Sequence, residues 1–141
     1  MAKYELEFYE DEDGDSPVLR WLREELTPAK RRILGHAMNV VLQSLGVEVC
    51  GTEFGKQLGG GLFEFRLRRD LHESSSMGDA EVGKVLFRVF CHAHGNKLIL
   101  LVGGYDKGAH PSARHQNAAI ELARSRLRDW RRRRPKGSGR H

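Results

Sequence analysis

Two histidines and an arginine share one face of a strand predicted near the middle of the sequence. Residues Lys84–His94 alternate in the manner of a β-strand, and the period of two places Arg88, His92 and His94 on the same side. An imidazole titrates near neutral pH and can take up or release a proton, and a guanidinium group matches the geometry of phosphate oxygens. This face therefore carries residue types suited to acid–base chemistry on a phosphate ester.

Further polar residues are expected to join this face. In the predicted strand Leu62–Arg68 apolar residues alternate with ionic ones, so its ionic side chains lie on one side. The polar residues expected on the face or at its edge are Lys56, Glu64, Arg66, Arg68, Lys84, Tyr105 and Lys107. Such a set can cleave RNA without a metal: a base deprotonates the 2′-hydroxyl, cations stabilise the charge on phosphorus, and an acid protonates the leaving 5′-oxygen.

These side chains also have plainer explanations. A strand arginine is often solvated or paired with a neighbouring acid. His92 and His94 could be structural, or could bind a metal, since suitable atom types recur at Cys91, His110 and His115. Cys91, however, is predicted on the opposite face from His92 and His94, and no acid recurs at ligand spacing. The sequence therefore predicts neither a metal site nor a cofactor.

The N-terminal part of the chain is predicted to form a strand and a helical hairpin. Lys3–Tyr9 alternates like a half-buried strand. Ser16 and Thr27, each followed by proline, favour the starts of two helices, and Gly46 favours the end of the second. Gly51–Gly61 is expected to be a glycine-rich loop, without the features of a nucleotide-binding loop.

Three strands and a helix are predicted to follow. Asp70–Gly83 lacks periodicity and is expected to be a long mobile connection. Lys84–Ala93 and Lys97–Tyr105 are expected to pair as an antiparallel hairpin, with Leu98–Val102, apolar on both sides, as the central strand. Pro111 and Ser112 favour the start of a last helix with an apolar stripe.

The order strand, two helices, three strands, helix predicts an α+β domain over residues 1–130. Its sheet is expected to be small, rich in antiparallel pairing and covered by helices. Residues 131–141 are expected to form a basic disordered tail, because they combine an arginine run with glycine, serine and proline.

Charge is distributed unevenly along the 141 residues. Met1–Leu26 holds nine acidic and three basic residues, whereas the remainder of the chain has a net charge of +11, which suggests a polyanionic partner. The longest apolar run, Leu98–Val102, is far shorter than the roughly 20 residues needed to cross a bilayer. No signal peptide is predicted, and Cys50 and Cys91 form no CxxC motif. A cytoplasmic protein that does not enter the membrane is the expectation.

The order of several short motifs resembles the phage-derived HigB branch of the RelE/ParE toxin superfamily. The matching stretches are Gly55–Leu58, Leu62–Arg66, Val85–Phe90, Leu100–Gly108 and Ile120–Arg126. The resemblance spans nearly all of Tyr4–Trp130. It implies a RelE-like fold, a type II toxin–antitoxin pair, and cleavage of mRNA in the ribosomal A site.

The resemblance also implies roles for individual residues. Lys56 matches a basic loop residue, Arg66 the arginine of a Glu-Leu-Arg strand, and Arg88 the basic residue of the third strand. Tyr105 and Lys107 match a Gly-Phe/Tyr-x-Lys segment, in which Gly108 replaces the usual second lysine. The residues expected to be catalytic are Arg66, Arg88, His92, His94, Tyr105 and Lys107, with His92 or His94 carrying protons. Those expected to bind RNA are Lys56, Arg68 and Lys84.

Two other functions are compatible with such a sequence. One is a superfamily member that poisons another target, such as DNA gyrase, and the other is a non-catalytic phage-type protein that only binds a partner. A toxin of this kind is expected to be silenced by a helix-turn-helix antitoxin, covering either the basic face or the acidic N-terminal strand and helical hairpin.

Overall fold

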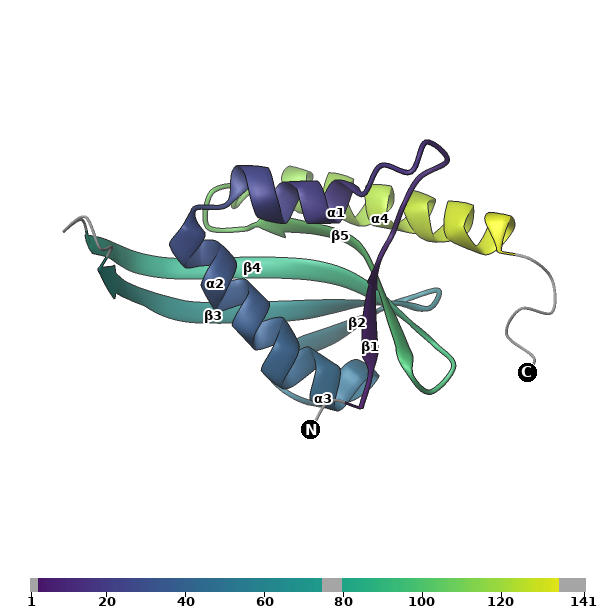
Figure 1. Cartoon of the computed structure of the whole chain (residues 1–141), viewed down its shortest axis with the longest axis horizontal. Helices are drawn as coiled ribbons and strands as arrows, with labels where there is room; N and C mark the ends of the chain where they lie inside the picture. The colour runs from purple at the N-terminus through teal and green to yellow at the C-terminus, as the bar shows by residue number, and fades with distance from the viewer. Residues whose placement is uncertain (1–2, 75–79, 135–141) are drawn as a thin grey trace.

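Five strands form one mixed sheet that runs through the middle of the molecule (Figure 1). The computed structural model describes residues 3–74 and 80–134, and between residues 70 and 83 only the backbone. The strands are β1 (Glu5–Phe8), β2 (Gly55–Gly59), β3 (Leu62–Ser74), β4 (Ala80–His94) and β5 (Leu98–Asp106). Their spatial order is β1-β5-β4-β3-β2, and all neighbours are antiparallel except β1 and β5, which are parallel.

Helices cover both faces of the sheet, so the predicted α+β class is confirmed. The helical segments are α1 (Pro17–Arg20), η1 (Trp21–Glu25), α2 (Pro28–Ala37), η2 (Met38–Leu42), α3 (Gln43–Leu45), η3 (Gly46–Gly51) and α4 (Ala113–Arg133). The segments before β2 pack on one face, over the buried residues Phe63, Phe65 and Phe87. Helix α4 packs on the other face, where Ala123 and Leu127 contact a second cluster around Phe90.

The predicted helix boundaries in the N-terminal half are confirmed. The Thr27 side chain accepts a hydrogen bond from the Lys30 amide at 3.2 Å, which caps α2. Helix α3 ends at Leu45, and Gly46 has a φ of 55°. A side chain at Gly46 would be strained by that φ and would also collide with the Tyr4 ring, 2.6 Å from an added Cβ atom.

Two predicted loops are partly wrong. Within the expected loop Gly51–Gly61, residues Gly55–Gly59 form β2, which pairs with β3 at the edge of the sheet. The expected connection Asp70–Gly83 is largely a continuation of β3 and β4, whose backbone ladder runs on from Asp70↔Lys84 to Ser74↔Ala80. The composition of both segments, rich in glycine or in polar residues, did not indicate a strand. They are strands because their backbone groups pair with a neighbouring strand, and such pairing does not require a particular side-chain pattern. Residues 75–79 lie outside the described residues.

Helix α4 also extends beyond the predicted limit of the domain. The tail was expected to begin at Arg131, whereas α4 ends at Arg133. Arg132 and Arg133 form ion pairs with Asp129, three and four residues earlier, and these pairs support the last helical turn. The hydrogen bonds from Arg133 and Tyr9 lower the pKa of Asp129 to about 2. Residues 135–141 lie outside the described residues.

The helical stretch Pro28–Gly51 is long and apolar enough to cross a membrane, with a mean hydropathy of 1.3 in its most apolar window. Part of its apolar surface, however, is buried, although Val40 and Val47 are exposed. Leu34, Ala37, Leu42 and Val49 are all buried in the core beneath this stretch. The arrangement is compatible with a core helix of a soluble protein.

Candidate functional site

A pocket lined mainly by cations opens on the α4 side of the sheet, over the paired strands β3 and β4. Helix α4 lies over β5 and part of β4 and leaves this area uncovered. The pocket, which we call the arginine pocket, has a volume of about 340 Å³. It is lined by Glu53, Phe54, Arg66, Arg68, Leu86, Arg88 and Lys107.

A buried carboxylate lies between two of the arginines. Arg66 on β3 and Arg88 on β4 are cross-strand partners, so their like charges face each other. The Glu64 side chain, with no exposed surface, accepts a hydrogen bond from Arg66 Nε at 2.6 Å and lies 3.6 Å from Arg88 Nε. Glu64 therefore compensates the repulsion between the two guanidinium groups and holds them side by side.

Polar atoms beside this carboxylate have unused hydrogen-bonding capacity. Among the described residues, Glu64 Oε1, Arg88 Nε and Tyr105 OH are buried without a hydrogen-bond partner. They come from the adjacent strands β3, β4 and β5, and Tyr105 is the cross-strand partner of Arg88. Burial lowers the pKa of Arg88, against the opposing effect of Glu64, and raises the pKa of Tyr105. Since buried polar groups in native proteins are normally paired, this concentration points to a functional site.

The structure brings together four of the residues predicted from the sequence. Arg66, Arg68, Arg88 and Lys107 all line the arginine pocket. Arg66 and Arg68 share this face because side chains alternate along β3. Lys107 follows the end of β5 and lies next to β4, where its amide donates a hydrogen bond to the Leu86 carbonyl at 2.7 Å.

Other predicted residues lie near the pocket without lining it. Lys56 on the edge strand β2 is the cross-strand partner of Glu64 and is exposed on the same face. Tyr105 is buried beside Arg88. Lys84 is exposed on β4, on the same side of the strand as Arg88.

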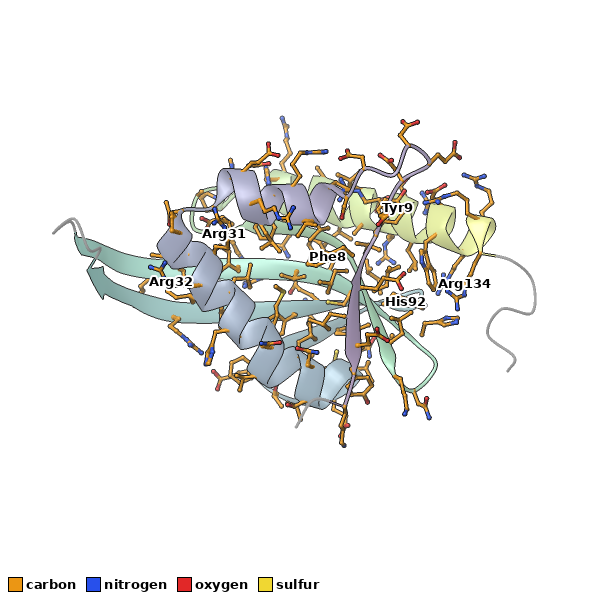
Figure 2. All side chains as sticks on the ribbon, viewed as in Figure 1. Phe8, Tyr9, Arg31, Arg32, His92 and Arg134 are labelled. Carbon is orange, nitrogen blue, oxygen red and sulfur yellow. The ribbon has the colours of Figure 1, made fainter. Side chains whose placement is uncertain are left out.

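His92 and His94 lie on the same side of β4 as Arg88, but away from the arginine pocket. His92 is four positions along the strand from Arg88, about 13 Å at the usual rise per residue. Both imidazoles pack edge-on against Trp130 of α4, with ring centroids at 5.8 Å and 5.2 Å. In Figure 2, His92 lies towards the end of α4 that carries Arg134. The expected grouping of these histidines with Arg88 in one site is therefore not found, because α4 covers that end of the strand.

His92 instead holds the turn between β2 and β3. Gly59, Gly60 and Gly61 all have positive φ, a conformation that favours glycine. His92 Nδ1 lies 2.8 Å from the Gly61 carbonyl oxygen, so this nitrogen carries the proton and donates. Arg124 and Arg131 donate to the carbonyls of residues 58–60. Side chains thus satisfy the carbonyls of the whole turn.

The burial of His92 predicts a pH-dependent stability. Burial lowers the pKa of His92 below its ordinary value; the hydrogen bond with the Gly61 carbonyl opposes this shift in part, whereas the nearby Arg131, His94 and Arg134 add to it. Between the lowered pKa and about 6.5 the unfolded chain binds more protons, so the free energy of unfolding should decrease as the pH falls below about 6.5. Urea unfolding of the wild type and of His92→Gln, at about pH 7.5 and about pH 5.5, measures this.

The variant is expected to lose part of the pH dependence. Burial also lowers the pKa of His94, so a residual dependence should remain. His36→Gln, on the exposed side of α2, is the matched control and should unfold as the wild type does at both pH values. A pH dependence that is the same in all three proteins would show that His92 does not titrate on unfolding.

Sequence reasoning did not anticipate two groups of residues near the pocket. Glu53, at its edge, had no motif or periodicity to mark it. His110 and His115 were weighed from the sequence only as metal ligands; His115 lies beside Tyr105, and His110 stacks on His115. Among the residues whose side chains the structure describes, 3–69 and 84–134, no group of three or more histidine, cysteine or acidic side chains could hold a metal ion.

Comparison with known proteins adds no family to this geometry. No family model and no curated protein matches the chain. The function is therefore inferred from the site.

Proposed function

We propose that the protein is a metal-independent endoribonuclease that cleaves mRNA on the ribosome, as the toxin of a type II toxin–antitoxin pair. The observation that carries the proposal is the arginine pocket, where three arginines and a lysine surround a space of about 340 Å³. Guanidinium groups match phosphate oxygens, and preorganised cations stabilise the charge that develops on phosphorus. The resemblance to HigB-like and RelE-like sequences supplies the ribosome, and hence the cytoplasm, as the place of action.

The reaction needs no nucleophile from the protein. The 2′-oxygen of the substrate attacks phosphorus while its proton passes to a base; the bond from phosphorus to the 5′-oxygen breaks, and an acid protonates that oxygen. The products are a 2′,3′-cyclic phosphate and a 5′-hydroxyl. Arg66 and Arg88 would bind the two non-bridging oxygens.

Side chains at the pocket itself replace the histidines as proton carriers in this proposal. Glu53 is the carboxylate that lines the arginine pocket with accessible surface, whereas Glu64 is fully buried beneath the arginines. We assign Glu53 as the acceptor of the 2′-hydroxyl proton and Lys107 as the donor to the leaving oxygen, because both lie at the pocket's edge within the described structure.

A basic toxin surface also suits the two proposed macromolecular partners. Ribosomal RNA and mRNA attract exposed lysines and arginines such as Lys56 and Arg68. The cognate antitoxin, a helix-turn-helix protein in this proposal, would silence the toxin by covering the arginine pocket.

Cleavage of mRNA in a translating extract tests the proposal. Alanine variants of two neighbouring arginines of β3, Arg68 and Arg69, provide an internal comparison. Arg68 lines the arginine pocket, whereas the adjacent Arg69 is exposed on the opposite side of β3. Mapping of mRNA 5′ ends should show cuts within codons for the wild type. Arg68→Ala should reduce the cutting rate about tenfold, as expected for losing one phosphate contact, and Arg69→Ala should leave it unchanged.

Three results would count against the proposal. Intact mRNA in an inhibited extract would exclude cleavage as the cause of inhibition. Conversion of a supercoiled plasmid to linear DNA in the presence of purified gyrase would identify a gyrase poison instead. Equal loss in Arg68→Ala and Arg69→Ala would show that general basicity, not the arginine pocket, matters.

A further inference from the structure

A second pocket adjoins the arginine pocket at the end of β5. Its volume is about 360 Å³, and it lies between β5, the helical segments α1, η1 and α2, and the first half of α4. Its wall includes Trp21, Tyr105, His110, His115, Leu122 and Arg126. Lys30 and Asp106 form an ion pair at 2.8 Å within it.

Three rings follow one another along this pocket. The centroids of Tyr105 and His115 are 5.0 Å apart, with the ring planes at 48°. His115 and His110 are stacked nearly parallel, 4.4 Å apart and at 7°. Tyr105 is buried, His115 is half-buried and His110 is exposed, so the series leads from the interior to the surface.

The ring series begins next to the arginine pocket. Tyr105 is the cross-strand partner of Arg88, which lines the arginine pocket. The next two residues separate the two spaces: Asp106 lines the second pocket and Lys107 lines the arginine pocket. An RNA strand whose phosphate is bound at Arg88 would therefore place the base of a neighbouring nucleotide near these rings.

We propose that the stacked imidazoles of His110 and His115 form a subsite for a nucleobase next to the phosphate in the arginine pocket. This inference rests on the proposed function and adds to it a single-stranded substrate with an unstacked base. Bases of single-stranded RNA stack on histidine and other aromatic rings, and such stacking tolerates any sequence because every base has a π-face. The half-exposed Leu122 provides apolar surface beside the rings.

The proposal requires a flat surface more than a charge. Lys30 pairs with Asp106 in the pocket, and Arg126 donates to the Val102 carbonyl at 3.0 Å, so these two cations of the wall already have partners inside the protein. Parallel rings at 4.4 Å, with the outer one exposed, present a plane to solvent. Phenylalanine at position 110 should therefore replace histidine, whereas alanine should not.

Binding of an uncleavable oligonucleotide tests this directly. The probes are a fluorescent 2′-O-methyl oligoadenylate, which lacks the nucleophilic hydroxyl, and an abasic oligomer of equal length and charge. The wild type should bind the oligoadenylate about tenfold more tightly than the abasic oligomer, by fluorescence anisotropy at low salt. His110→Ala and His115→Ala should lose this preference without weakening the abasic complex, and His110→Phe should keep it. His36→Ala, on α2, is the matched control.

The outcomes separate this inference from the proposed function. If Arg88→Ala weakens both complexes while His110→Ala and His115→Ala behave as the wild type, the subsite is wrong and the RNA-binding pocket stands. If His110→Phe is as weak as His110→Ala, the imidazole does not act by stacking. If the wild type binds neither oligomer, the subsite is overturned, whereas the proposed cleavage on the ribosome is decided by the mapping of mRNA 5′ ends. Thermal unfolding of each variant confirms that the comparison involves folded proteins.

Discussion

Replacing Arg88 by alanine is expected to reduce mRNA cleavage at least 100-fold while the protein stays folded. Removal of one preorganised donor to a developing negative charge commonly costs a factor of 10² to 10³ in rate. The Arg88 side chain is only 12% exposed and lines the arginine pocket. Single-turnover cleavage on ribosomes with a defined codon in the A site gives the rate.

The fold should survive this change because Glu64 keeps a partner. Arg66 Nε remains hydrogen-bonded to Glu64 Oε2 at 2.6 Å when Arg88 is absent. The near-ultraviolet circular dichroism spectrum and the unfolding transition should therefore stay cooperative. Arg88→Lys is the informative companion: it restores a charge without the guanidinium fork, so activity should recover only in part. Full growth inhibition by Arg88→Ala would remove Arg88 from the site.

The common face of the arginines could be predicted because it depends on local geometry alone. Alternation with period two fixes the side of a strand on which a residue lies, and it correctly placed Arg66 and Arg68 together on β3. The caps at Thr27 and Gly46 were equally local, since each acts within one helical turn. The apolar stripe of α4 likewise predicted which side of the helix faces the sheet.

The division of that face could not be predicted, because it depends on tertiary contacts. Where α4 crosses the sheet decides that His92 and His94 meet Trp130 while Arg88 stays at a pocket. The alternation of residues along a strand does not tell where on the sheet a later helix will pack. The proximity of His115 to Tyr105 has the same origin, since it depends on how the first turn of α4 packs beside the end of β5.

Sheet pairing set a second limit on prediction. β5 was expected to be the central strand, whereas it lies second in the order, between β1 and β4. An apolar strand buried on both faces indicates that other elements cover both sides of the sheet there, but it does not tell which strand is in the middle. The parallel pairing of β1 with β5 is possible because a long stretch of chain, the helical segments and strands β2 to β4, lies between them in sequence. Hydrophobic alternation carries no information about this pairing.

Replacing Glu64 by glutamine is expected to lower the free energy of unfolding by about 3 kcal/mol, since removing one member of a buried ion pair leaves an uncompensated charge. Glutamine has nearly the same shape, so the change isolates the carboxylate charge. Without it, the facing guanidinium groups of Arg66 and Arg88 repel each other at the bottom of the arginine pocket. Cleavage should fall as well, because the two cations lose the group that positions them.

Urea unfolding at neutral pH measures the stability effect, and its salt dependence identifies the cause. Ion pairs at the surface are screened by salt, whereas buried pairs are screened much less, so the difference between Glu64→Gln and the wild type should persist at high salt. Glu121→Gln, on the exposed side of α4, is the matched control and should change stability little. Adding Arg66→Gln to Glu64→Gln removes one of the two facing charges and should restore part of the loss. An unfolding midpoint in Glu64→Gln equal to that of the wild type would mean that this carboxylate does not hold the arginines in place.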